Sequence, residues 1–228
     1  MIFMKDVYKK YANGVTALNG IDVDIDQGEF VYVVGPSGAG KSTFIKLIYR
    51  EEKVTEGTVI INDININELK ERKVPYLRRD IGVIFQDFKL LPKLTVYENI
   101  AYALEVIGES PRTIRKRVME VLEIVGLKNK ARFIPDELSG GEQQRVSIAR
   151  AIVNHPKIVI ADEPTGNLDP KTSSGLMDTF EEINNRGTTI IMATHSKEIV
   201  NTIKNRVIAI EDGLIVRDEH RGEYGYEV

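Results

Sequence analysis

The glycine-rich segment Gly35–Ser42 has the residue types and spacing of a loop that binds phosphate groups. It follows Phe30–Val34, an apolar run rich in β-branched and aromatic residues that predicts a buried strand. The glycines allow a tight turn that brings backbone N–H groups against phosphate oxygens. A helix predicted to begin near Lys41 points the positive end of its dipole at the same phosphates.

Two side chains of this loop carry most of its expected chemistry. Lys41 should reach the β- and γ-phosphates of a nucleotide, and the hydroxyl of Ser42 should bind Mg²⁺. The alternative is a chance glycine-rich loop, but the predicted strand before it and the helix after it are the required context. The residues expected to contact ATP are Gly35, Pro36, Ser37, Gly38, Ala39, Gly40, Lys41, Ser42 and Thr43.

Polar side chains follow three further predicted strands, at the point where each strand ends. These are residues 158–161 with Asp162 and Glu163, residues 81–85 with Gln86, and residues 188–194 with His195. Ligands of open α/β sheets bind beyond the carboxyl ends of the strands, so we expect these side chains to converge on the phosphate site. Asp162 is expected to hold the Mg²⁺ shell, and Glu163 to polarise the attacking water. Each of these side chains alone is more often solvated or structural.

A second motif, Ser139–Glu142, has the S-x-x-E pattern of a capping box at a helix start. It contains Gly140 and Gly141, although glycine costs about 1 kcal/mol inside a helix. An ordinary capped helix does not explain these glycines, whereas a ligand that must approach the backbone closely does. A terminal phosphate is the expected ligand.

Taken in order, these motifs resemble those of the ATP-binding cassette (ABC) ATPases, over nearly the whole chain. Residues 138–143 are similar to the family's signature motif, Gln86 to its Q-loop, residues 167–169 to its D-loop and His195 to its H-loop. Tyr11 stands at the position of the family's aromatic residue that stacks on adenine. The alternative is that Tyr11 only packs in the core or at the sheet edge, as tyrosines near an N-terminal strand commonly do.

The resemblance implies a head-to-tail dimer, in which each ATP lies between the phosphate loop of one subunit and the signature segment of the other. It gives catalytic roles to Lys41, Gln86, Glu163 and His195, and Mg²⁺ contacts to Ser42, Gln86 and Asp162. Further nucleotide contacts implied by the family are Tyr11, Ser139, Gly140, Gly141, Glu142 and Asp169.

The composition of the chain argues against several classes of protein. The chain has 228 residues, a net charge of −3 and no cysteine. It therefore has no strong basic field for nucleic acid, no disulfide and no thiolate metal site. No run approaches the roughly 18 apolar residues of a membrane span. We expect a cytoplasmic protein that reaches the inner face of the membrane through a partner.

The expected fold is α/β: an ABC-type P-loop core with a mostly parallel sheet, an N-terminal antiparallel β subdomain and an inserted helical subdomain. Capping signals at Thr95 and Ser110 predict two helices of the insertion, and Gly126 should end the second. Glu211–Leu214 predicts a hairpin turn. The expected boundaries are residues 1–86 and 156–220 for the core, 87–155 for the helical subdomain and 221–228 for a mobile tail.

The stretch Gln86–Pro92 carries Phe88, Leu90 and Leu91 directly after the glutamine expected at the nucleotide. These apolar residues either belong to the core of the helical subdomain or line a groove for a partner helix. In transport-type members of the family, this surface receives a cytoplasmic helix of the membrane subunit.

Residues 161–169 resemble the family branch of cell division, lipoprotein release and macrolide export. Within that branch, residues 46–51, 87–92, 97–101 and 222–226 are most similar to the cell-division ATPases of Gram-positive bacteria. Those ATPases pair with an FtsX-like membrane subunit that controls peptidoglycan hydrolases. The alternatives are a lipoprotein-releasing or macrolide-type exporter ATPase, a soluble ABC protein of DNA repair or translation, and a scaffold that does not hydrolyse ATP.

Overall fold

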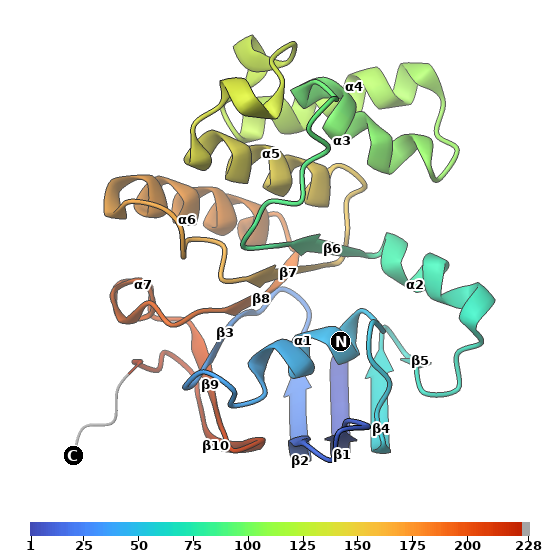
Figure 1. Ribbon diagram of the computed structural model, residues 1–228, viewed down its shortest axis with the longest axis vertical. Helices are drawn as coiled ribbons and strands as arrows, with labels where there is room; N and C mark the ends of the chain where they lie inside the picture. Colours follow the sequence, from blue (N-terminus) through green and yellow to red (C-terminus); the bar gives the residue numbers. More distant parts are fainter. Residues whose placement is uncertain (225–228) are drawn as a thin grey trace. The chain divides into compact units, whose positions relative to one another are not determined.

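The computed structural model, drawn in Figure 1, describes residues 1–224. The chain divides into two compact units. Unit 1 comprises residues 1–78 together with the chain from Thr189 onward, and unit 2 comprises Arg79–Thr188. The division assigns the predicted functional residues to two sets, one in each unit.

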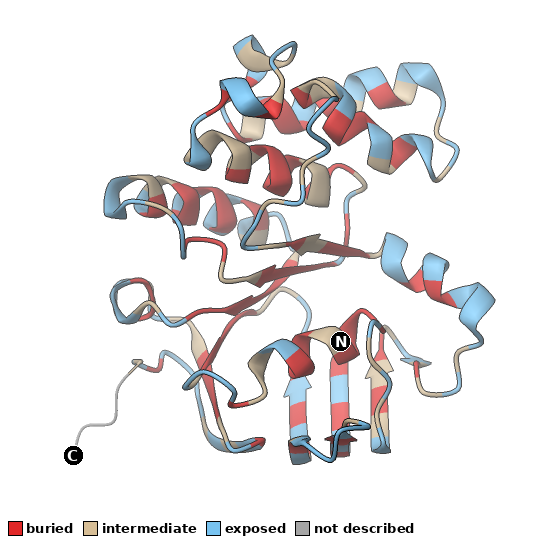
Figure 2. Cartoon of the chain, in the orientation of Figure 1, coloured by how far each residue is buried: buried red, intermediate tan, exposed pale blue. Residues whose placement is uncertain are grey.

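Unit 1 contains an antiparallel sheet with the strand order β2-β1-β4-β5. Figure 2 shows alternating buried and exposed bands along β1 and β2, because successive side chains of a strand point to opposite faces. This sheet is the expected N-terminal antiparallel subdomain. Its strands are β1 Ile2–Lys10, β2 Thr16–Ile25, β4 Glu56–Ile61 and β5 Ile64–Asn65.

Unit 1 also contains strands in the order β10-β9-β3-β8, of which β9, β3 and β8 run parallel. Every residue of β3 and β8 is buried, as the continuous apolar runs predict for strands covered on both faces. The elements are β3 Phe30–Val34, α1 Lys41–Ile48, η1 Glu71–Lys73, α2 Val74–Arg79 at the boundary of the unit, β8 Thr189–Ala193, α7 Lys197–Thr202, β9 Arg206–Glu211 and β10 Leu214–Glu219.

Unit 2 combines a parallel strand pair with helices that pack on one another. Its elements are β6 Ile81–Ile84, α3 Val96–Glu105, α4 Pro111–Ile124, η2 Lys128–Lys130, η3 Pro135–Glu137, α5 Gly140–Ile152, β7 Ile158–Asp162 and α6 Pro170–Asn185.

Local signals fix the ends of the helices in unit 2. Thr95 and Glu98 form the predicted capping box of α3, and Ser110 caps α4, which begins with proline. Gly126 follows the end of α4 with a φ of 71°, in the left-handed region that favours glycine. The predicted hairpin is also present, between β9 and β10.

Residues 221–224, the first part of the predicted mobile tail, contact unit 1. The backbone N–H of Gly222 donates to Asn205 at 3.1 Å, and Glu223 pairs with Lys204 at 2.6 Å. Residues 225–228 lie outside the described residues. Across residues 1–224, none of the helices has the length and apolar character that crossing a membrane requires.

Candidate active site

The phosphate loop joins β3 to α1, and its backbone makes the turn that its glycines permit. Gly35, Gly38 and Gly40 have φ angles of 145°, 80° and 114°. A Cβ at Gly35 would lie 2.0 Å from the carbonyl oxygen of Ile210, and one at Gly40 would lie 2.5 Å from that of Ala17. A Cβ at Gly38 would meet nothing within 4 Å. The loop is thus packed tightly at its two ends and open in the middle, as a cradle for phosphate oxygens must be.

Lys41 lies inside this cradle. Its Nζ donates to the carbonyl oxygens of Gly35 at 2.7 Å and Pro36 at 2.9 Å. Ser42 is exposed in the first turn of α1, whose N-cap is Gly40. A bound phosphate would replace the loop carbonyls as acceptors for the ammonium group, and it would meet the free N–H groups of the helix start.

Tyr11, which follows β1, is tied to the same helix. Its hydroxyl lies 3.1 Å from Oγ1 of Thr43, and Nζ of Lys9 lies 4.8 Å from the centre of its ring. Lys9 is itself nearly buried and forms an ion pair with Glu52 at 2.7 Å. The Tyr11 ring is therefore held at its hydroxyl and on one face, and the structure brings this ring close to the residues that follow Lys41.

His195 lies at the same sheet edge as the phosphate loop. Strands β3 and β8 pair in parallel with Val33 opposite Ala193. Two residues further along each strand stand Gly35 and His195, and His195 is exposed. Unit 1 therefore contains the phosphate loop with Tyr11 beside its helix, and His195 at the same sheet edge as the loop.

The acidic pair of unit 2 stands at the end of β7. Strands β6 and β7 pair in parallel with Ile84 opposite Ala161, so Gln86 and Glu163 follow at one edge. Asp162 is the last residue of β7. Glu163 has a φ of 49°, and such strain, which costs about 1–3 kcal/mol, is concentrated at functional sites.

Gln86 packs against the turn that begins at Glu163. A Cβ at Gly166 would lie 3.0 Å from Nε2 of Gln86, and Nδ2 of Asn167 donates to the backbone oxygen of Gln86 at 3.4 Å. The backbone N–H of Gly166 donates to the oxygen of Glu163 at 3.1 Å. Unit 2 therefore brings Gln86, Glu163 and the predicted D-loop together.

The signature helix α5 begins with the predicted capping box. The Ser139 side chain accepts from the backbone N–H of Glu142 at 3.4 Å, and Oε2 of Glu142 accepts from the backbone N–H of Ser139 at 2.9 Å. The Ser139 hydroxyl also donates to that carboxylate at 3.1 Å. Both partners of the cap therefore satisfy N–H groups that the helix start would otherwise leave free.

The start of α5 packs on the start of α6. A Cβ at Gly141 would lie only 2.4 Å from the Cγ2 methyl of Thr172. The Thr172 hydroxyl donates to Asp169, the N-cap of α6, at 2.5 Å, and this bond lowers the pKa of the Asp169 carboxyl. The structure thus brings the signature glycines and the D-loop aspartate into one packed corner of unit 2.

The stretch after Gln86 is held by two side chains that the sequence reasoning missed. Phe88 and Lys89 have φ angles of 59° and 49°, and Arg150 of α5 donates to their backbone oxygens at 2.8 and 2.6 Å. Burial lowers the pKa of Arg150. Asn99, fully buried in α3, accepts from the backbone N–H of Leu91 at 2.8 Å and donates to its oxygen at 3.1 Å.

The predicted Mg²⁺ contacts have suitable chemistry. Ser42, Gln86 and Asp162 supply hydroxyl, amide and carboxylate oxygens, which are the donors that Mg²⁺ prefers. Among residues 1–224, no group of three or more His, Cys, Asp or Glu side chains is placed to hold a metal by itself. Oxygen donors of these three types fit a cation that also takes ligands from water and nucleotide phosphates.

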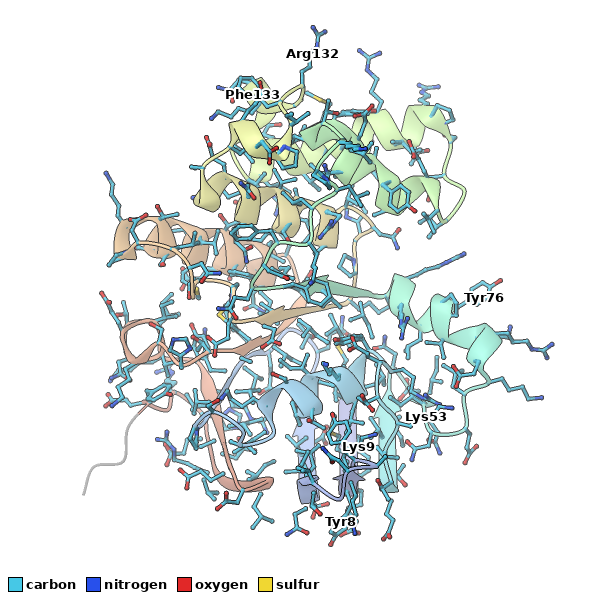
Figure 3. All side chains as sticks on the ribbon, viewed as in Figure 1. Tyr8, Lys9, Lys53, Tyr76, Arg132 and Phe133 are labelled. Atoms are coloured by element: carbon cyan, nitrogen blue, oxygen red, sulfur yellow. The ribbon has the colours of Figure 1, made fainter. Side chains whose placement is uncertain are left out.

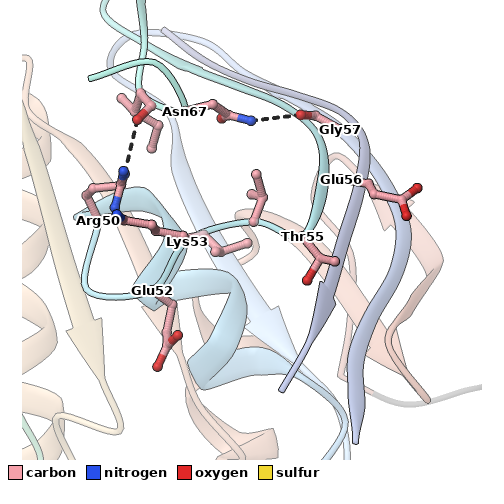
Figure 4. A pocket seen from close by; sticks show the side chains of 10 residues that line it. Arg50, Glu52, Lys53, Thr55, Glu56, Gly57 and Asn67 are labelled. Atoms are coloured by element: carbon pink, nitrogen blue, oxygen red, sulfur yellow. Dashed lines mark hydrogen bonds between the residues drawn. The ribbon is translucent and has the colours of Figure 1, made fainter. Parts of the chain in front are cut away.

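A pocket of about 200 Å³ lies elsewhere in unit 1, around the connection between α1 and β4 (Figure 4). Arg50 and Asn67 make the hydrogen bonds drawn across it. None of the residues predicted to bind ATP lines this pocket. Two of its lining residues, Glu52 and Lys53, bind the ammonium of Lys9, which lies over the Tyr11 ring.

Comparisons with known proteins identify the family of the chain. The model of the ABC transporter family matches residues 18–166. The chain is 73% identical over 225 residues to the cell division ATP-binding protein FtsE of Bacillus subtilis, covering 99% of each chain. It is 63% identical over 227 residues to FtsE of Streptococcus pneumoniae strain D39, covering 100% of this chain and 99% of the relative.

Comparison with solved structures also finds ATP-binding cassettes. A dimeric ATP-binding cassette bound to ADP and phosphate in a post-hydrolysis state superposes with a TM-score of 0.88 at 39% identity, covering 99% of this chain and 100% of that one. CbiO1 of Clostridium perfringens, part of an ABC transporter complex, superposes with a TM-score of 0.90 at 30% identity, covering 96% and 88%. The expected fold class is confirmed. The chain belongs to the ABC transporter family and is an ATP-binding cassette that hydrolyses ATP.

Proposed function

We propose that this protein is the ATPase subunit of a cell-division complex, which dimerises on ATP and drives an FtsX-like membrane subunit that controls peptidoglycan hydrolysis. The observation that carries the proposal is the 73% identity to a cell division ATP-binding protein, over 99% of both chains. The protein would then act in the cytoplasm, on the inner face of the membrane, through its partner.

ATP is held by its phosphates and its base. Lys41 exchanges the carbonyls of its loop for the β- and γ-phosphates, while the N–H groups of the loop and of α1 receive phosphate oxygens. Tyr11 stacks on adenine, an interaction worth about 1–3 kcal/mol per base. Ser42, Gln86 and Asp162 would hold Mg²⁺, which would supply charge neutralisation at the phosphates.

Hydrolysis requires an ordered water molecule. Glu163, whose strained backbone directly follows β7, accepts a proton from this water. His195 contacts the γ-phosphate from the end of β8. The second subunit of the dimer closes the site with Ser139, Gly141 and Asp169, so cleavage follows dimerisation.

The membrane subunit docks beside Gln86. Leu91 is 38% exposed, and neither Phe88 nor Leu90 is buried, which favours the docking interpretation over a role in the core of the helical subdomain. Arg150 and Asn99 fix the backbone of this stretch, so a bound partner meets a preformed surface.

The test is capture of the membrane subunit from detergent extracts of cells that produce both proteins. Leu91→Glu should reduce capture at least tenfold, because burying one such side chain contributes about 1.5–3 kcal/mol and the new charge adds a penalty. Val106→Glu is the matched control, because Val106 is an apolar residue of the same unit that is 66% exposed. It should leave capture unchanged.

Three results would count against the proposal. A folded Leu91→Glu protein that still captures the membrane subunit would place docking elsewhere. Loss of capture with both Leu91→Glu and Val106→Glu would contradict docking of the membrane subunit at this stretch. If the wild-type protein captured a lipoprotein-releasing or macrolide-type subunit instead, the role in cell division would be wrong.

A further inference from the structure

The signature helix has a carboxylate at the position where phosphate is expected to approach. A helix N-terminus carries roughly +0.5 of an elementary charge, which attracts phosphate. The Glu142 carboxylate adds a full negative charge in the first turn of α5. Left unpaired, it would outweigh the helix dipole and repel the terminal phosphate of ATP.

Lys130 neutralises this carboxylate. Its Nζ lies 2.5 Å from Oε1 of Glu142, and the two side chains are only 27% and 26% exposed. The ammonium also lies 5.5 Å from the ring centre of Phe133, in the exposed segment labelled at Arg132 and Phe133 in Figure 3. Lys130 is thus fixed between a carboxylate and an aromatic ring.

The two oxygens of Glu142 have different partners. Oε1 contacts Lys130, while Oε2 accepts from the backbone N–H and the hydroxyl of Ser139. The pKa of Glu142 lies below its usual value, mainly because its carboxylate accepts from Lys130 and next because it accepts from the backbone N–H of Ser139. Lys130 can therefore keep the carboxylate in the helix cap when the Ser139 hydroxyl turns to another acceptor.

We propose that Lys130 is a positioning residue for nucleotide-driven dimerisation: it neutralises Glu142 and keeps the cap of α5 in place, so that Ser139 and the helix start can receive the γ-phosphate of ATP bound to a second copy of the chain. The inference rests on the shared ATP site of the proposed function. Lys130 itself need not touch the nucleotide.

The experiment measures ATP-driven dimerisation by sedimentation, in a Glu163→Gln background that prevents turnover. Lys130→Met should raise the ATP concentration needed for half-maximal dimer at least tenfold, because truncating one member of a partly buried charge pair leaves the other uncompensated. Lys130→Arg should stay close to the background protein. Binding of a fluorescent ATP analogue to the monomer should not change.

The decisive variant is Lys130→Met combined with Glu142→Gln. Glutamine keeps the shape of the cap without its charge, so the double variant should recover dimerisation to within about threefold of the background protein. Lys128→Met is the matched control, because Lys128 lies in the same η2 turn and pairs instead with Glu123 at 2.8 Å. It should have no effect.

Each other outcome is informative. If Glu163→Gln alone fails to dimerise with ATP, the shared site of the proposed function is wrong. If it dimerises and Lys130→Met behaves like it, only the role of Lys130 is overturned. If Glu142→Gln does not rescue Lys130→Met, or if Lys128→Met is equally defective, the effect belongs to the structure of the 128–133 segment and the inference fails.

Discussion

Replacing Gly141 by alanine tests the packing of the signature helix directly. The new Cβ would lie 2.4 Å from the Cγ2 methyl of Thr172, while the next atoms, Cβ and Oγ1 of Thr172, would be at 3.7 and 3.8 Å. Only one methyl group is therefore in the way. The added methyl also points at α6 of the same chain, so Gly141→Ala would disturb the corner that contains Asp169.

The expected cost follows from two opposing terms. Overpacking of this kind costs about 1–3 kcal/mol. Alanine is favoured over glycine in a helix by about 1 kcal/mol. Gly141→Ala should therefore lower the free energy of unfolding by about 0–2 kcal/mol. It should also lower ATP turnover, because Thr172 holds the carboxylate of Asp169.

Thr172→Ser removes the obstructing methyl and keeps the hydroxyl that donates to Asp169. The Gly141→Ala/Thr172→Ser protein should therefore exceed the stability of Gly141→Ala, although loss of the methyl itself costs up to about 0.8 kcal/mol. Urea unfolding measures the stability, and phosphate release measures turnover. Both should recover together.

Additive losses in the double variant would refute the steric argument, because a clash between two residues must produce coupling. Recovery of stability without turnover would show that glycine 141 is needed for the phosphate itself. Thr172→Ser alone is the control, and it should remain close to the wild type in turnover.

The remaining predictions concern the chemistry of the site. Glu163→Gln should lower phosphate release by about 10²–10⁴-fold, because a positioned base contributes that much, yet elute as a dimer with ATP and Mg²⁺; normal turnover would remove Glu163 from its role. Lys41→Ala should raise the Kd of a fluorescent ATP analogue, because Lys41 neutralises the phosphates in the ground state as well; unchanged binding would contradict this. Ser139→Arg should block dimer closure with near-normal affinity of the monomer for ATP, and mixing it with Lys41→Ala should recover part of the activity, because a mixed dimer has one intact site. Full activity of Ser139→Arg alone would rule out a shared site.

The sequence predicted those parts of the site that short motifs encode. The strand before Gly35 and the helix from Lys41 follow from local composition, and the capping boxes at Thr95 and Ser139 are present as expected. Parallel pairing then explains why polar residues at strand ends gather at one edge within each unit.

Contacts between distant residues could not be predicted in this way. Arg150 is 62 residues from Phe88, and nothing in its own neighbourhood marks it as a partner of that backbone. Lys130 and Thr172 likewise acquire their roles only when the start of α5 packs on other segments. Helix α2 was also missed, because its six residues include a proline and are too few to display a helical period.

Because Arg150 binds the backbone oxygens of Phe88 and Lys89, α5 connects that stretch mechanically to the N-terminus of the helix. The helix has 13 residues, which gives a length of about 20 Å. One end carries Arg150 and the proposed docking stretch, and the other begins at Ser139, which is expected to meet ATP. A rigid helix transmits a shift along its axis from one end to the other. In the proposed complex, movement of a docked membrane helix would therefore also displace the end of α5 expected to receive phosphate, and closing of the ATP site would exert force on the membrane subunit through the same helix.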